Sequence, residues 1–162
     1  MSQPKGYSAT QIVLHWAVFA LIALQFLLND AIGAAYRAVM RGQTPEFGVL
    51  VLQHVAGGVL ILALVIWRMV LKVRRGAPLP PAHEPPILQK IATGTHLALY
   101  LFTIVTVLSG GMAWFGGFAA AGTAHEIFKT VLLVLIGLHV AGALYQKFVL
   151  KSDVMTRMLR PE

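Results

Sequence analysis

The sequence predicts an all-α protein, a transmembrane four-helix bundle with both termini in the cytoplasm. Three observations support this fold class. Of the 162 residues, 57% are hydrophobic and only 12% are charged, and the mean hydropathy is +0.74, which is far outside the range of soluble domains of this size. Four apolar stretches are long enough to cross a hydrocarbon core of about 30 Å. Lysine and arginine are also unevenly distributed among the connections.

The four predicted spans are residues 12–28, 49–71, 91–115 and 127–149. A helix rises about 1.5 Å per residue, so each crossing needs about 20 residues. The first span is short, and we expect Gln11 and Gln25 near its interfaces. It could also be a secretory signal cleaved within residues 31–35, but His15 and Trp16 are unusual in a discarded leader. No repeat is visible, so we expect a single domain over residues 1–162.

Basic residues predict the orientation of the bundle. Most precede the first span or lie in the middle connection and the tail: Lys5, Arg68, Lys72, Arg74, Arg75, Lys90, Lys147, Lys151, Arg157 and Arg160. The other side has only Arg37, Arg41 and Lys129. By the positive-inside rule, both termini and the middle loop face the cytoplasm of a multi-pass inner-membrane protein. This topology explains the net charge of +7, so nucleic-acid binding is not expected.

The connections differ in character. The outer connection, residues 29–48, contains AAYRAVMR, which can form a short interfacial helix with Tyr36 and Met40 in lipid. The cytoplasmic connection is rich in proline and includes His83, so we expect an extended link there. The last outer connection reads GGFAAAGTA, residues 116–124, and is expected to be a small flexible loop.

Cysteine is absent and histidine is plentiful in the spans. The absence of cysteine excludes iron–sulfur clusters, haem attached through C-x-x-C-H, disulfides and thiol catalysis. Five histidines lie in or at the edge of a span: His15, His54, His96, His125 and His139. An ionisable group at such a position is costly and is a candidate for function. One histidine of this kind is often only hydrogen-bonded to a neighbouring helix, but five favour a shared role.

Depth in the membrane arranges these histidines in two layers. His15 and His96 lie on the cytoplasmic side and His54 on the outer side, whereas the fourth span enters at His125 and reaches His139 about 21 Å deeper. Fourteen residues at about 100° each fall about 40° short of four turns, so His125 and His139 share a helix face. We therefore pair His54 with His125 and His15 with His139, and leave His96 over. Two facing imidazoles can bind both axial positions of one haem iron, which predicts two haems suited to electron transfer.

The surroundings of the histidines fit a bulky planar ligand. Small residues lie close to them in sequence: Gly57, Gly58, Ser109, Gly110, Gly111, Gly137 and Gly142. They would let a macrocycle approach the backbone, although ordinary helix packing also uses small residues. Arg68 follows His54 by fourteen residues, where a cytoplasmic haem would need a cation for its propionates; it could also be only a positive-inside residue. Lys129 is expected to face the outer propionates or to attract an anionic substrate.

These motifs together resemble the prokaryotic cytochrome b561 family. They are LHW at 14–16, H-x-x-x-G at 54–58 with WR at 67–68, H-L-x-x-Y at 96–100, LSGG at 108–111 and HE to GLH over 125–139. The resemblance covers essentially the full length. It implies a four-helix bundle with two haem b groups and the iron ligands His15, His54, His125 and His139. His96 also matches the pattern, but it is expected to bind a propionate, a water or a quinone instead of iron.

The resemblance also suggests an activity. Some family members resemble superoxide oxidases, so we expect an oxidoreductase that passes electrons from superoxide to ubiquinone, with no catalytic residue assigned. Glu126, His125 and His96 are the titratable groups within reach of quinone protonation. One alternative is a haem-bearing subunit that takes electrons from a hydrogenase or dehydrogenase partner, although such a partner is not required. Another is a divalent-metal transporter, which needs ligands clustered at one site.

Overall fold

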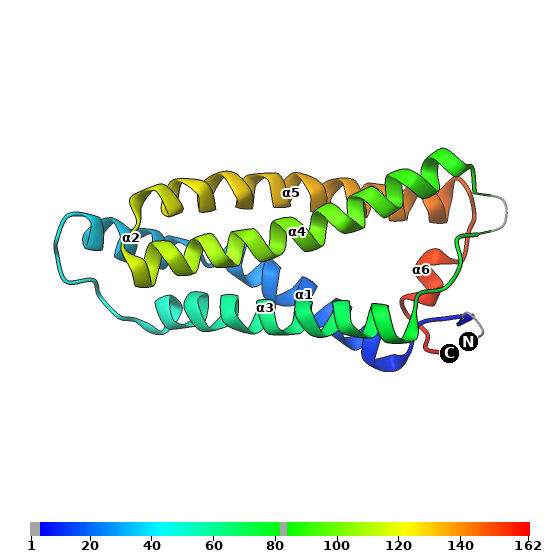
Figure 1. Cartoon of the computed structure of the whole chain (residues 1–162), viewed down its shortest axis with the longest axis horizontal. Coiled ribbons are helices and arrows are strands. Elements are labelled where there is room, and N and C mark those ends of the chain that lie inside the picture. The colour runs from blue at the N-terminus through cyan, green and yellow to red at the C-terminus, as the bar shows by residue number, and fades with distance from the viewer. Residues whose placement is uncertain (1–3, 82–83) are drawn as a thin grey trace.

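The protein is a bundle of long helices in the computed structural model, which describes residues 4–81 and 84–162 (Figure 1). Its helices are α1 (Ala9–Leu27), α2 (Asp30–Met40), α3 (Val49–Arg75), α4 (Pro86–Gly116), α5 (Ala119–Phe148) and α6 (Val154–Arg157). The described residues contain no strand. Four helices, α1, α3, α4 and α5, are long and apolar enough to cross a membrane. The predicted all-α class with four spans is confirmed, whereas His83 lies outside the described residues.

The turn between the last two long helices is tighter than predicted. Residues 116–124 were expected to form a flexible loop, but α4 continues to Gly116 and α5 begins at Ala119. The prediction was wrong because the alanines of this stretch are strong helix formers and extend α5 toward α4. Gly117 makes the reversal with φ at 67°, a left-handed conformation that glycine adopts without steric cost.

The N-terminal helix α1 is fixed at its start by side-chain hydrogen bonds. The Ser8 hydroxyl accepts from the Gln11 N–H at 3.3 Å, and the Gln11 side chain accepts from the Ser8 N–H at 3.0 Å. This reciprocal capping box satisfies two donors that the helix end leaves free. The Gln11 amide also donates to the Gly76 carbonyl at 3.1 Å. Gln11 therefore lies near the end of α1, as predicted, but its side chain turns inward to bind the end of α3.

The long helices form two packed pairs (Figure 1). Helices α4 and α5 pack extensively on each other and α1 packs on α3, whereas α3 contacts α4 over a shorter stretch. Neither α1 nor α3 packs comparably against α5. The pair α1/α3 comes from the first half of the chain and α4/α5 from the second. The bundle is thus two sequential helical hairpins, with space between them for polar side chains.

The two ends of the bundle carry different elements. Both termini and α6 lie at one end, here called the termini end, and α2 lies at the other, the α2 end (Figure 1). The predicted short helix exists as α2, but the prediction that Tyr36 dips into lipid was wrong. A Cβ atom added at Gly122 of α5 would lie only 2.2 Å from the Tyr36 hydroxyl. Gly122 therefore admits the Tyr36 ring, and α2 folds back onto the bundle.

The C-terminal segment is fastened across the termini end. The Glu162 carboxylate accepts hydrogen bonds from the backbone N–H groups of Gly6 at 3.1 Å and Lys5 at 3.2 Å. It also forms an ion pair with Arg75 at 3.3 Å. These contacts join the two ends of the described chain to the last turn of α3.

The carboxylate of Glu162 should make the stability of the protein depend on pH. The N–H groups of Gly6 and Lys5, followed by Arg75, hold the pKa of the Glu162 carboxyl below its ordinary value of 4.5. A lowered pKa stabilises the folded state above the ordinary value, and the contribution is lost as pH falls through the folded pKa. Glu162→Gln should therefore lower the Tm at pH 7, and the difference should be smaller at pH 4, below the ordinary pKa of 4.5.

Thermal unfolding in detergent at both pH values measures this effect. Glu46→Gln is the matched control, because Glu46 is exposed and forms no ion pair among the described residues. A Tm difference of equal size at both pH values would contradict the role of the Glu162 carboxylate.

Candidate functional site

Four of the predicted site histidines face one another as two pairs between the helical hairpins. His54 of α3 faces His125 of α5 with ring centroids 6.4 Å apart. His15 of α1 faces His139 of α5 with centroids 6.1 Å apart. Each pair combines one imidazole from the N-terminal hairpin with one from the C-terminal hairpin. The structure thus brings together the residues that depth in the membrane had paired.

His96 makes the second pair a cluster of three imidazoles. Its ring centroid lies 5.1 Å from that of His139. A metal–nitrogen bond of about 2 Å puts the centroid of a ligating ring about 3 Å from the metal, so rings on opposite sides of one iron have centroids about 6 Å apart. The separations of 6.4 and 6.1 Å fit this requirement. The separation between His96 and His139 is too short for it.

The imidazole of His125 is held in place by α4. Its Nδ1 lies 2.8 Å from the Thr106 carbonyl, and a carbonyl partner requires a proton on Nδ1. The Nε2 lone pair is then free to bind a metal. A Cβ atom added at Gly110 would lie 2.9 Å from the ring, so only glycine leaves His125 room here. The Nδ1 of His54, by contrast, is buried and has no partner among the described residues.

A large cavity lies beside His54 and His125. Its volume of about 1260 Å³ exceeds the roughly 300–1,000 Å³ typical of ligand pockets. Side chains from α1 to α5 line it, and most of them are apolar. Of the glycines expected near a haem, Gly58, Gly110 and Gly111 line this cavity, whereas Gly57 does not. Two facing imidazoles, a buried nitrogen without a partner and a roomy apolar cavity fit a haem.

Four charged side chains also line the cavity at the α2 end, those of Asp30, Arg37, Glu126 and Lys129. Lys129 Nζ forms an ion pair with Glu126 at 2.7 Å, so its charge is partly balanced on its own helix. Arg37 of α2 is a further cation on the lining, a position that was not predicted from the sequence. Helical periodicity could have predicted this position, because Gly33, Arg37 and Met40 are spaced to lie on one helix face and all three line the cavity.

Arg68 lies at the termini end, near the second imidazole pair. Its guanidinium donates to the Gln11 carbonyl at 3.4 Å and is close enough to act electrostatically on His15 and His139. The fourteen-residue spacing between His54 and Arg68 had predicted that Arg68 lies at the depth of this second pair. Nearby, Lys72 Nζ lies 5.6 Å from the centre of the Tyr100 ring. Cations and a phenol thus surround the three imidazoles at this end.

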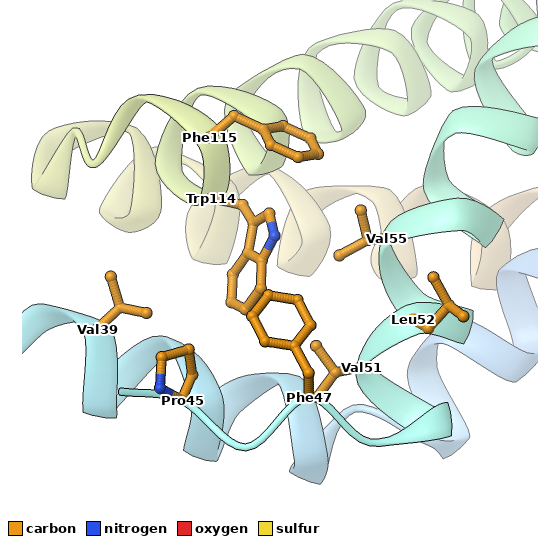
Figure 2. A pocket seen from close by; sticks show the side chains of 8 residues that line it. All are labelled: Val39, Pro45, Phe47, Val51, Leu52, Val55, Trp114 and Phe115. Atoms are coloured by element: carbon orange, nitrogen blue, oxygen red, sulfur yellow. The ribbon is translucent and has the colours of Figure 1, made fainter. Parts of the chain in front are cut away.

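A second, smaller pocket adjoins the large cavity at the α2 end (Figure 2). It has a volume of about 500 Å³, and the rings of Phe47 and Trp114 meet edge to face there with centroids 5.7 Å apart. Its lining is Val39, Pro45, Phe47, Val51, Leu52, Val55, Trp114 and Phe115. Three of these, Val55, Trp114 and Phe115, also line the large cavity. Because none is charged, this pocket offers no cationic side chain to an anionic substrate.

The metal-transporter alternative finds no support in this geometry. In residues 4–81 and 84–162, no group of three or more histidine, aspartate or glutamate side chains is arranged to hold a metal ion. The carboxylates of Asp30 and Glu126 line only the α2-end cavity. A transporter of this class would need several such ligands at one site.

Comparison with known proteins identifies relatives over the whole chain. Residues 6–161 match the family described as prokaryotic cytochrome b561. Cytochrome b562 of Cereibacter sphaeroides is 33% identical over 161 residues, which are 99% of both chains. The "probable superoxide oxidase CybB" of Yersinia pestis is 27% identical over 176 residues, 96% of each chain. "Cytochrome b561 homolog 1" of Escherichia coli is 26% identical over 181 residues, 94% of this chain and 96% of its own.

These matches agree with the structure, both in the length of chain that they cover and in the membrane-spanning helices that a cytochrome b requires. The family match spans nearly every described residue, and the bundle has four helices that can cross a membrane. Imidazoles from all four of those helices meet between the hairpins. The chain therefore belongs to the prokaryotic cytochrome b561 family and is a multi-pass membrane haem protein of electron transport.

Proposed function

We propose that the protein binds two haem b groups and is a superoxide:quinone oxidoreductase of the inner membrane. His54 and His125 would hold one haem and His15 and His139 the other, so that residues 1–162 form one di-haem unit. The observation that carries this proposal is the pair of facing imidazole couples, with centroids 6.4 and 6.1 Å apart. When bound, the haems supply one-electron transfer, and the protein supplies position, charge and exclusion of water.

Helix α5 sets the distance between the two couples. It contributes His125 and His139, which are fourteen residues or about 21 Å apart on one helix face. A single rigid helix therefore fixes both sites relative to each other. His96 lies too close to His139 for these two imidazoles to hold one haem iron between them, so we assign it to a propionate or to quinone.

Basic residues orient the proposed reaction across the membrane. The termini end carries most of the lysines and arginines, which by the positive-inside rule assigns it to the cytoplasm. The α2 end, with the large cavity, then faces outward. Arg37 and Lys129 line that cavity and would attract superoxide, an anion, to the outer site. Glu126 weakens this attraction through its ion pair with Lys129, and Asp30 is a second carboxylate on the lining that opposes it.

Quinone is assigned to the termini end in this proposal. Reduction of a quinone takes two electrons and two protons, so hydrogen-bonding and titratable groups are needed beside the inner couple. His96 lies against His139, and Lys72 and Tyr100 are in contact nearby. The 27% identity to a protein named as a probable superoxide oxidase supports the choice of superoxide as donor.

Superoxide generated outside liposomes that contain the protein and ubiquinone should reduce the haems and yield ubiquinol. Arg37→Gln should slow haem reduction and weaken its dependence on ionic strength, because it removes a cation that attracts the anion. Arg41→Gln is the control, since Arg41 is not among the residues lining the cavity. Haems that stay oxidised, with no quinol formed, would exclude superoxide as donor. Co-purification of a catalytic redox subunit would then favour the hydrogenase or dehydrogenase alternative.

The assigned ligands predict how haem content responds to loss of single histidines. His139→Ala and His54→Ala should each lower the content from two haems per chain to one, because each removes one axial ligand. His96→Ala should retain both haems, since its imidazole is outside both couples. Quantified reduced-minus-oxidised spectra measure these numbers. Loss of haem in His96→Ala, or two haems in His139→Ala, would overturn the pairing.

The close contact between Gly110 and the His125 ring predicts a further effect on haem binding. In Gly110→Ala, the new Cβ would lie 2.9 Å from the His125 ring and would displace it. Overpacking of this kind costs about 1–3 kcal/mol, so the affinity for the haem at His125 should fall about tenfold or more. Gly94→Ala, on the same helix, is the control because its Cβ meets no atom within 4 Å. Equal haem affinity of the two variants would contradict a tight fit at Gly110.

A further inference from the structure

Gln25 joins α1 to the turn of α3 that carries His54. Its amide Nε2 donates to the His54 backbone carbonyl at 2.8 Å, and its Oε1 accepts from the Gln53 side chain at 3.2 Å. Both hydrogen-bonding functions of the Gln25 amide are therefore used on α3. An amide within a membrane span is costly unless it finds such partners. The contact thus explains why a glutamine stands in the apolar helix α1.

Gly57 makes this approach of α1 to α3 possible. A Cβ atom at position 57 would lie 3.0 Å from Gln25 Nε2, closer than ordinary van der Waals contact. Gly57 is not among the residues that line the large cavity, whereas Gly58 is. In a helix the His54 carbonyl already accepts the N–H four residues later, so Gln25 adds a second donor to it. The small residue at 57 thus serves the contact with Gln25.

The ring of His54 depends on its backbone for its position. Its Nδ1 has no partner among the described residues, whereas the Nδ1 of His125 is 2.8 Å from the Thr106 carbonyl. His54 also lies only five residues after the first residue of α3, Val49, where a helix frays most easily. A contact that fixes its backbone therefore determines where the imidazole lies.

We infer that Gln25 is a positioning residue for His54. It holds the backbone of His54 against α1, so that the imidazole stays 6.4 Å from that of His125. This inference rests on the proposed function, in which His54 and His125 hold one haem. Gln25 also lines the large cavity, and we assign its effect on haem binding to the contact with His54.

Haem titration of the haem-free protein tests the inference. Gln25→Leu keeps the size of the side chain and removes both hydrogen bonds. We expect one of the two sites to bind haem about 10- to 100-fold more weakly, as for other residues that orient a metal ligand, and its haem to become partly high-spin. The second site should keep its affinity and its low-spin spectrum. Gln11→Leu is the matched control, because the Gln11 amide binds the other end of α3, at the Gly76 carbonyl.

Gly57→Ala tests the same contact without removing any polar group. It should weaken the same site, because its Cβ would push the Gln25 amide away by a few tenths of an ångström. This variant decides the question if Gln25→Leu does not fold. In the double variant the two effects should not add, since both act through one contact.

Two outcomes separate this inference from the proposed function. Native haem affinity and spectra in both Gln25→Leu and Gly57→Ala, with one haem lost in His54→Ala, would overturn the role of Gln25 alone. Two haems retained in His54→Ala would overturn the ligand assignment itself, and with it the positioning role.

Discussion

Hydrocarbon cannot hydrogen-bond, so every polar group within a span must find its partner inside the bundle. The protein meets this constraint by joining helices through their backbones. Gln11 and Gln25, at opposite ends of α1, donate to the carbonyl of Gly76, directly after α3, and to that of His54 in α3. On the other side of the molecule, His125 of α5 binds the carbonyl of Thr106 in α4. These contacts hold each hairpin together and fix the register of its two helices.

The same constraint shapes the interior between the hairpins. Threonine and serine hydroxyls of α4 bind carbonyls of their own helix: Thr103 to Leu99, Thr106 to Phe102 and Ser109 to Thr106. They leave no unpaired donor facing the gap. The imidazoles that face each other across the gap, by contrast, are not bonded to each other, with ring centroids more than 6 Å apart. A bound group between the rings would satisfy nitrogens that the protein itself leaves free.

The long helices and the levels of the histidines could be predicted from sequence, because they depend on local quantities. Hydropathy over about 20 residues defines a span, and helical periodicity relates His125 to His139. The return of Tyr36 onto α5 could not be predicted, because it depends on the space above Gly122, a residue far away in sequence. The helical start of α5 at Ala119 was missed because its glycines and alanines were interpreted as a loop. The contact between His125 and Thr106 could not be predicted, because it uses the backbone carbonyl of Thr106 and therefore does not depend on the type of residue at that position.

The division into two sequential hairpins also has a consequence for biogenesis. Residues 9–75 complete the first hairpin before any of α4 or α5 has been synthesised. Each facing imidazole couple takes one ring from each hairpin. Neither couple exists on the ribosome until α5, the last long helix, has entered the membrane and met its partner hairpin. In the proposed function, haem would therefore be captured only after α5 has been inserted, because a chain that lacks α5 would have neither complete imidazole couple.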